Sequence, residues 1–68
     1  MTLTLTINGE TQTLSGPLSV SALLESLGIP LTKVAVERNL EIVPKSQYNA
    51  TQLSTGDKLE IVNFVGGG

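Results

Sequence analysis

Polar and apolar side chains alternate strictly over residues 2–7, where threonine alternates with leucine or isoleucine. A period of two predicts a strand with one buried face. Asn8-Gly9 follows directly, and this pair favours a tight hairpin because both central residues of a type I′ turn take a positive φ. We therefore expect a second, antiparallel strand over residues 10–14.

The register of this second strand has two solutions. A two-residue turn places Glu10 and Gln12 on the same face as Ile7 and Leu5, which directs two polar side chains toward the core side. Either the strand lies at an edge of the sheet and runs past the core, or the loop is longer and contains a bulge. The sequence pattern is compatible with both arrangements.

An apolar stripe with the helical spacing i, i+3, i+4 and i+7 comes next: Val20, Leu23, Leu24 and Leu27. The stripe predicts a short helix over residues 20–27 with Ser19 as its N-cap. Gly28 ends the helix, Ile29 takes the position of the hydrophobic contact in a Schellman-type end, and Pro30 prevents continuation. Because so short a helix is marginal in water, we expect it to lie on a sheet.

The second half of the chain contains three further strand patterns. Residues 34–36 and 41–43 predict short strands joined by a turn at Asn39. A turn at Gly56-Asp57 precedes the last strand, which the alternation of apolar residues places at 58–65.

The elements follow the order ββαββ and then β, with no clear period over residues 45–52. One helix across one face of a mixed sheet of about five strands is the economical packing of these parts, so we predict an α+β fold. Residues 1–65 form the predicted domain and residues 66–68 a flexible glycine tail. The predicted core consists of Leu3, Leu5, Ile7, Leu23, Leu27, Val36, Leu59 and Ile61.

Composition limits the chemistry of the side chains. The sequence has no Cys and no His, which excludes disulfides, thiolate chemistry and the commonest metal ligand and general base. Glu37, Glu41 and Glu60 have no spacing that favours a metal or acid–base site, and a solvated face explains them. We therefore expect no metal, no cofactor and no catalytic side chain, and a protein that is not an enzyme.

Charge and hydropathy narrow the choice of partners. The net charge is -2, and the four basic residues form no cluster, which argues against nucleic acid as a partner. No apolar run approaches the roughly 18 residues of a membrane span, and the first basic residue is Lys33, so neither a signal peptide nor an anchor is expected. The expected location is the cytoplasm, and the expected state of the free protein is a monomer.

Three glycines end the chain directly after an apolar strand. Such an end can be a frayed terminus or a solubilising tail. It can also be threaded into a narrow active-site channel of a partner enzyme, because it has no side chains. There the carboxylate of Gly68 could react with ATP to form an acyl-adenylate, and a sulfur nucleophile could then convert it to a thiocarboxylate. Since the chain has no Cys, the sulfur would come from elsewhere.

Apolar side chains close to this tail suggest a docking surface. Val62 and Phe64 alternate with the core-facing residues of the last strand and therefore point outward, and Val65 continues toward the tail. In the alternative interpretation, Phe64 folds back onto residues 45–48 as a rim of the core.

The second half of the chain, ERNLEIVPKSQYNATQLSTGDKLEIVNFVGGG, resembles the sulfur-carrier proteins of thiamine biosynthesis, the ThiS family. The resemblance implies a ubiquitin-like β-grasp fold. Tyr48, where tryptophan is frequent in the family, and Asn63 depart from the family pattern. The elements that carry the resemblance are the Asn39 turn, Val43-Pro44-Lys45-Ser46, the aromatic Tyr48, Leu53, Gly56-Asp57, and the closing Glu60-Ile61-Val62 and Val65-Gly66-Gly67-Gly68.

The resemblance also implies the partners. A ThiF-like adenylyltransferase would activate the carboxylate of Gly68 with ATP, a sulfur-donor protein would supply the sulfur of the thioglycine, and thiazole synthase would consume it. Gly66 and Gly67 would be recognised inside the partner's channel. Molybdopterin-type carriers and ubiquitin-like protein modifiers share the Gly-Gly end and remain alternatives. A passive β-grasp recognition module is a third interpretation, against which the negative charge and the glycine end argue.

Overall fold

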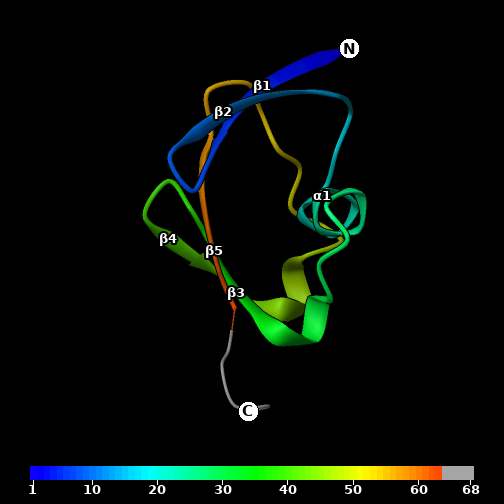
Figure 1. Cartoon of the computed structure of the whole chain (residues 1–68). Coiled ribbons are helices and arrows are strands. Elements are labelled where there is room, and N and C mark those ends of the chain that lie inside the picture. The colour runs from blue at the N-terminus through cyan, green and yellow to red at the C-terminus, as the bar shows by residue number, and fades with distance from the viewer. Residues whose placement is uncertain (64–68) are drawn as a thin grey trace.

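The computed structural model describes residues 1–63, which form one mixed sheet crossed by a single helix (Figure 1). The strand order is β2-β1-β5-β3-β4. β1 and β5 are parallel, and the other neighbouring strands are antiparallel. The α+β prediction is therefore confirmed. The elements are β1 (Thr2–Ile7), β2 (Glu10–Ser15), α1 (Val20–Ser26), the 3-10 helix η1 (Leu31–Lys33), β3 (Val34–Arg38), β4 (Glu41–Val43), the 3-10 helix η2 (Lys45–Gln47) and β5 (Lys58–Asn63).

The first hairpin has the two-residue turn that Asn8-Gly9 predicts. Both turn residues have positive φ, 50° for Asn8 and 85° for Gly9, and Ile7 pairs directly with Glu10. Because β2 is one of the two edge strands of the sheet, the polar side chain of Glu10 stays exposed although it lies on the same face as Ile7. The edge-strand solution is thus correct, and no bulge is needed.

The helix begins and ends with the capping groups expected from the sequence. The Ser19 Oγ accepts a hydrogen bond from the backbone N–H of Ala22 at 3.1 Å. Gly28 has a φ of 72°, and the N–H of Ile29 donates to the carbonyl of Leu24 at 2.9 Å, the long bond of a Schellman end. Leu27 is the C-cap residue, so the helix stops one residue before the predicted boundary.

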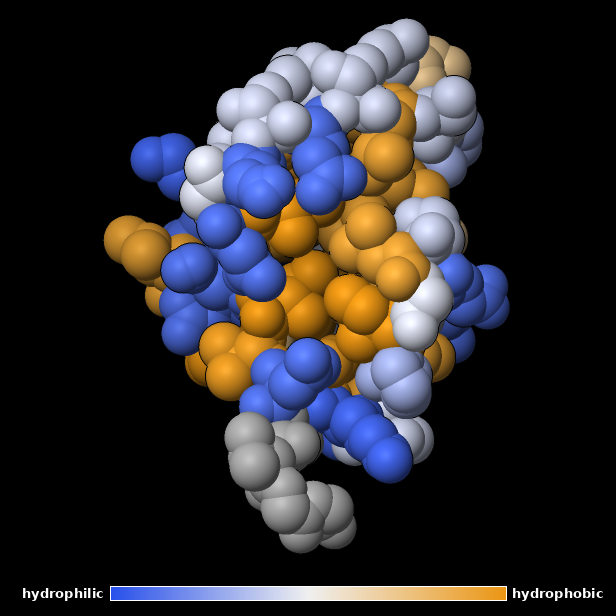
Figure 2. All heavy atoms as spheres, in the orientation of Figure 1, coloured by the Kyte–Doolittle hydropathy of each residue, from blue (hydrophilic) through white to orange (hydrophobic). Residues whose placement is uncertain are grey.

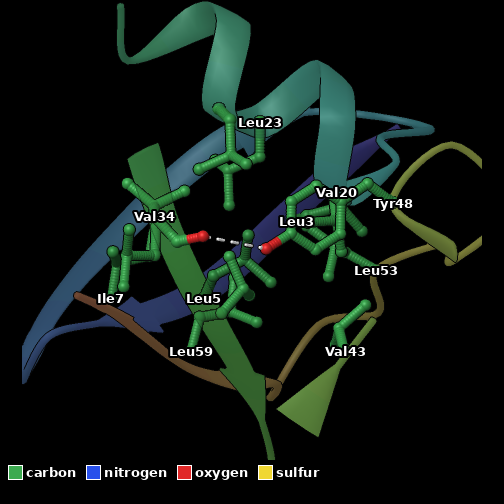
Figure 3. Packing of buried hydrophobic residues seen from close by; sticks show 13 residues of the cluster. Leu3, Leu5, Ile7, Val20, Leu23, Val34, Val43, Tyr48, Leu53 and Leu59 are labelled. Atoms are coloured by element: carbon green, nitrogen blue, oxygen red, sulfur yellow. Dashed lines mark hydrogen bonds between the residues drawn. The ribbon is translucent and has the colours of Figure 1, made fainter. Parts of the chain in front are cut away.

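The hydrophobic core lies between α1 and the sheet. In Figure 3, Leu23 points from the helix toward the strands that carry Leu5 and Val34. Leu5 and Leu23 are completely buried. The buried hydrophobic residues are Leu3, Leu5, Ile7, Val20, Leu23, Leu24, Val34, Val36, Val43, Tyr48, Leu53, Leu59 and Ile61.

Leu27 is the one predicted core residue that is not fully buried. It packs against the core but remains half-exposed, because it caps the end of the helix at the margin of the sheet. Tyr48 and Leu53 are buried although residues 45–52 have no clear period. The hydroxyl of Tyr48 donates to the carbonyl of Val34 at 3.4 Å (Figure 3), and burial raises the pKa of this phenol.

The segment that contains Tyr48 also supplies hydrogen-bond acceptors for the first N–H groups of α1. The first N–H groups of a helix have no partner within the helix. Here the N–H of Val20 donates to the carbonyl of Thr51 and that of Ser21 to the carbonyl of Tyr48, both at 3.0 Å. The segment after η2 is therefore fixed by backbone hydrogen bonds to the helix as well as by burial of Tyr48.

Within residues 1–63, no helix has the length and apolar character needed to cross a bilayer.

Candidate functional site

The candidate site is built around β5, the central strand of the sheet, because the chain continues from it through Phe64 and Val65 to the glycines. Of the predicted site residues, the structure describes Val62. Phe64, Val65, Gly66, Gly67 and Gly68 lie outside the described residues.

On one side of β5, Asn8 extends the pairing beyond the end of β1. The backbone N–H of Asn8 donates to the carbonyl of Leu59 at 2.9 Å. Its side-chain Nδ2 donates to the carbonyl of Ile61 at 3.2 Å, and its Oδ1 accepts the N–H of Ile61 at 2.7 Å. The carboxamide thus takes the place of a peptide group in the ladder and fixes β5 two residues before Asn63.

On the other side of β5, a group of polar side chains surrounds Asp57 at the start of the strand. Arg38 Nε donates to Asp57 Oδ2 at 2.8 Å and Asn39 Nδ2 donates to Asp57 Oδ1 at 3.0 Å. The backbone N–H of Ser54 also donates to Asp57 Oδ2. Asn39 Oδ1 in turn accepts the N–H of Lys58 at 2.9 Å. These bonds join the β3–β4 turn to the first residue of β5.

The ionisation of Asp57 reflects this environment. The side chain is buried, and burial alone would raise its pKa. The hydrogen bonds from Ser54, Arg38 and Asn39, together with the charge of Arg38, outweigh burial and hold the pKa of Asp57 below its usual value. The interpretation of Gly56-Asp57 as a turn is consistent with this structure, in which Asp57 serves to anchor β5.

Val62 points away from the core, as its position in the strand predicts. It is 59% exposed, whereas Leu59 and Ile61 on the opposite face of β5 are buried. Two further apolar side chains that sequence reasoning missed are exposed nearby, Leu40 at 90% and Ile42 at 65%. Alternation with Val43 is the signal that predicts the exposure of Ile42. It was missed because a strand of three residues is too short to show a clear period.

These side chains belong to the open face, by which we mean the face of the sheet turned away from α1. Ile42 pairs with Glu37 and Glu37 with Glu60, and paired residues share a face of the sheet. A groove of about 610 Å³ is lined by β5 from Lys58 to Val62 together with Asn8, Gly9 and Leu40. Figure 2 shows apolar side chains that stand out at the left margin of the molecule, where the β3–β4 turn lies.

Two of the three glutamates considered for metal or acid–base chemistry, Glu37 and Glu60, are cross-strand partners. Glu41 and Glu60 are exposed and Glu37 is half-buried. Among residues 1–63, no three His, Cys, Asp or Glu side chains are close enough to hold a metal ion together.

This combination of a mixed sheet in the order β2-β1-β5-β3-β4, one helix across one face and a central last strand that precedes a run of glycines defines a ubiquitin-like β-grasp domain. The chain belongs to the ThiS family, whose family model matches residues 5–68. The family expected from the sequence is thus confirmed.

A solved structure supports the fold independently. The crystal structure of the thiamine biosynthesis protein ThiS from Geobacter metallireducens is 36% identical in sequence and superimposes with a TM-score of 0.83, covering 97% of this chain and 100% of that one.

Two curated relatives differ in length. A thiazole synthase from Paramagnetospirillum magneticum is 59% identical over 64 residues, which are 94% of this chain but 20% of that protein, so the chain spans about a fifth of its length. The sulfur carrier protein ThiS from Bacillus subtilis is 44% identical over 50 residues, 74% of this chain and 76% of that protein.

Proposed function

We propose that this protein is a sulfur carrier of thiamine biosynthesis whose working group is the carboxylate of Gly68. The observation that carries the proposal is the ThiS family match, which extends over residues 5–68 and so includes all three glycines. The likeness to the Bacillus subtilis sulfur carrier protein ThiS supports the same role. These likenesses also favour the thiamine branch over molybdopterin-type carriers and protein modifiers.

The proposed chemistry proceeds in two substitutions. A carboxylate oxygen of Gly68 attacks the α-phosphorus of ATP, pyrophosphate leaves, and an acyl-adenylate forms. A sulfide-equivalent nucleophile then attacks the carbonyl carbon, AMP leaves, and a thiocarboxylate remains that delivers sulfur for thiazole formation. The chain is a co-substrate in this scheme, since the enzyme that binds ATP supplies the catalysis.

Three partners follow from this chemistry. A ThiF-like adenylyltransferase activates the carboxylate, a sulfur-donor protein provides the sulfur, and a thiazole synthase consumes it. The thiazole synthase from Paramagnetospirillum magneticum, a fifth of which is similar to this chain, supports the last of these partners. A cytoplasmic monomer is the state that suits such exchange between partners.

The position of β5 immediately before the last residues suggests separate roles for the folded domain and the glycine tail. Residues 1–65 act as the carrier domain and residues 66–68 as the reactive tail. Val62, whose side chain is exposed, docks on the partner together with Phe64 and Val65. Gly66 and Gly67 are recognised in a channel that admits backbone alone.

Intact-mass measurement tests the proposal. The chain is incubated with ATP, the adenylyltransferase of the same organism and a sulfur source, and a mass gain equal to the replacement of one oxygen by sulfur is expected. Omission of ATP is the control and should abolish the gain. Tandem mass spectrometry should place the sulfur on Gly68, and a complete reaction mixture that leaves the mass unchanged would refute the proposed function.

A further inference from the structure

The conformation of Leu40 is the starting point. The β3–β4 hairpin has a two-residue turn in which Asn39 and Leu40 both have positive φ, 54° and 72°. The β1–β2 hairpin has the same kind of turn with Gly9 in the equivalent second position. Glycine, asparagine and aspartate tolerate this region, whereas a branched apolar side chain is disfavoured there. Leucine is therefore an unfavourable residue for the backbone conformation at position 40.

Burial of the Leu40 side chain does not compensate for this unfavourable backbone conformation. Leu40 is 90% exposed, so its side chain contributes almost no packing to the folded domain. A residue that strains the backbone and packs against little is better explained by function than by folding. Leu40 also lines the groove over β5 together with Val62.

A second unfavourable arrangement lies on the same open face. Glu37 and Glu60 are direct cross-strand partners, and like charges in such positions destabilise a sheet. No Lys or Arg forms an ion pair with either of them within residues 1–63. The open face thus combines exposed apolar side chains, Leu40, Ile42 and Val62, with two adjacent carboxylates that have no ion-pair partner among residues 1–63. Lys58, two residues before Glu60 in β5, lies on the same face of the sheet.

We propose that Leu40 is the apolar anchor by which the domain docks on the enzyme that adenylates its tail, and that this enzyme brings a basic side chain to Glu37 and Glu60. The inference rests on the proposed function, because it assumes an enzyme that acts on Gly68. A hydrophobic pocket for Leu40 and a cation over the glutamates complement both features of the face. The groove runs along β5 from Lys58, beside the β3–β4 turn that carries Leu40, to Val62, one residue before the end of the strand, so an enzyme seated along it reaches the end of β5 from which the chain continues toward Gly68.

The anchor is tested by kinetics. ATP–pyrophosphate exchange by the adenylyltransferase of the same organism is measured against carrier concentration for wild type and Leu40→Asn. Asparagine accepts the turn conformation but cannot fill an apolar pocket. We expect KM for the carrier to rise about tenfold, as for loss of a buried interface anchor, with kcat unchanged. The melting temperature should stay at or above that of wild type, and Leu40→Gly serves as a second variant of the same design.

The charge is tested by Glu60→Lys, with Glu10→Lys as the matched control. Glu10 is also exposed but belongs to β2, at the edge of the sheet opposite β4. Glu60→Lys should remove the repulsion with Glu37 and so preserve or raise the melting temperature, yet it should increase KM and weaken the dependence of KM on salt. Glu10→Lys should change neither quantity.

The outcomes separate the two proposals. If wild type is not adenylated at all, the proposed function fails. If wild type is adenylated and a folded Leu40→Asn keeps the wild-type KM, or loses kcat instead, the anchor is refuted while the function stands. Dimerisation of wild type that Leu40→Asn abolishes, measured by sedimentation, would show that a second copy covers this surface and would likewise refute the anchor.

Discussion

Asn8 and Ile61 are separated by 53 residues in sequence, yet the carboxamide of Asn8 forms two hydrogen bonds with the backbone of Ile61, one as donor and one as acceptor. Asn8 therefore has two functions. Its positive φ closes the first hairpin, and its side chain fixes the central strand just before the candidate tail. A single residue thus links local turn formation to the position of β5, the strand that precedes the proposed tail.

Asn8→Gly separates these two functions. Glycine keeps the turn conformation but removes the carboxamide, so the variant should lose about 1 kcal/mol of unfolding free energy per hydrogen bond removed. Chemical denaturation monitored by circular dichroism measures the change. A matched control is Glu10→Gln in the same hairpin, which should leave stability near wild type. Wild-type stability in Asn8→Gly would show that water replaces the carboxamide without loss.

Asp57 predicts a pH dependence of stability. Hydrogen bonds and the charge of Arg38 hold its pKa in the folded state below its usual value, while the unfolded value is about 3.9. A depressed folded pKa means that the ionised carboxylate favours the native state, so its contribution is complete above about pH 4 and is lost as pH falls through the lower folded pKa.

Asp57→Asn tests this dependence. The variant should be destabilised at pH 7 by about 1 to 3 kcal/mol, because Arg38 and the N–H of Ser54 lose a charged acceptor. Between pH 5 and pH 2, it should lose less additional stability than wild type. Unfolding free energies from urea titrations at several pH values provide the measurement. Parallel pH profiles for the two proteins would mean that other carboxyl groups cause the acid sensitivity.

Leu5 predicts the cost of a cavity in the core. Its side chain is completely buried between the sheet and α1, and Leu5→Ala should cost about 2 to 5 kcal/mol of unfolding free energy. A small domain has roughly 5 to 15 kcal/mol in total, so this could be a large part of its stability. Thr4→Ala, on the exposed side of the same strand, is the control. A loss below about 1 kcal/mol would indicate that the core collapses around the missing side chain.

Most of the fold is predictable because its signals are local. Alternation in β1, the Asn8-Gly9 turn and the capping residues of α1 each determine structure over a few residues. Tyr48 and Leu53 are buried without a local pattern, since they lie in an irregular segment whose position depends on hydrogen bonds to the start of α1. The periodicity of apolar residues does not predict which side chains are buried in such segments.

The candidate site is predictable to a smaller extent. The exposure of Val62 follows from alternation within one strand. The bonds of Arg38 and Asn39 to Asp57 depend instead on pairings between strands that are far apart in sequence. Leu40 follows a recognised turn residue, but its positive φ depends on the two-residue length of the turn, which the pairing of Arg38 with Glu41 establishes.

The last prediction concerns the length of the tail: deletion of Gly68, or addition of one residue after it, should abolish sulfur loading without lowering the melting temperature. Glycine has no side chain to bury, so a change at position 68 is expected to remove no side-chain packing. In an adenylating active site, the attacking oxygen must lie within about 3 to 3.5 Å of the phosphorus. One residue of extended chain spans up to about 3.3 to 3.6 Å, and a shift of that size takes the oxygen out of reach.

Gly67→Val tests the channel separately from the length. This variant keeps the terminal carboxylate at its position in the chain, but a β-branched side chain does not fit a channel shaped for backbone alone. Adenylation rates and melting curves should therefore show loss of activity at wild-type stability in all three variants. Sulfur loading of the shortened or lengthened chain would mean that the carboxylate of Gly68 is not the working group, whereas activity in Gly67→Val alone would retain the carboxylate and reject the narrow channel.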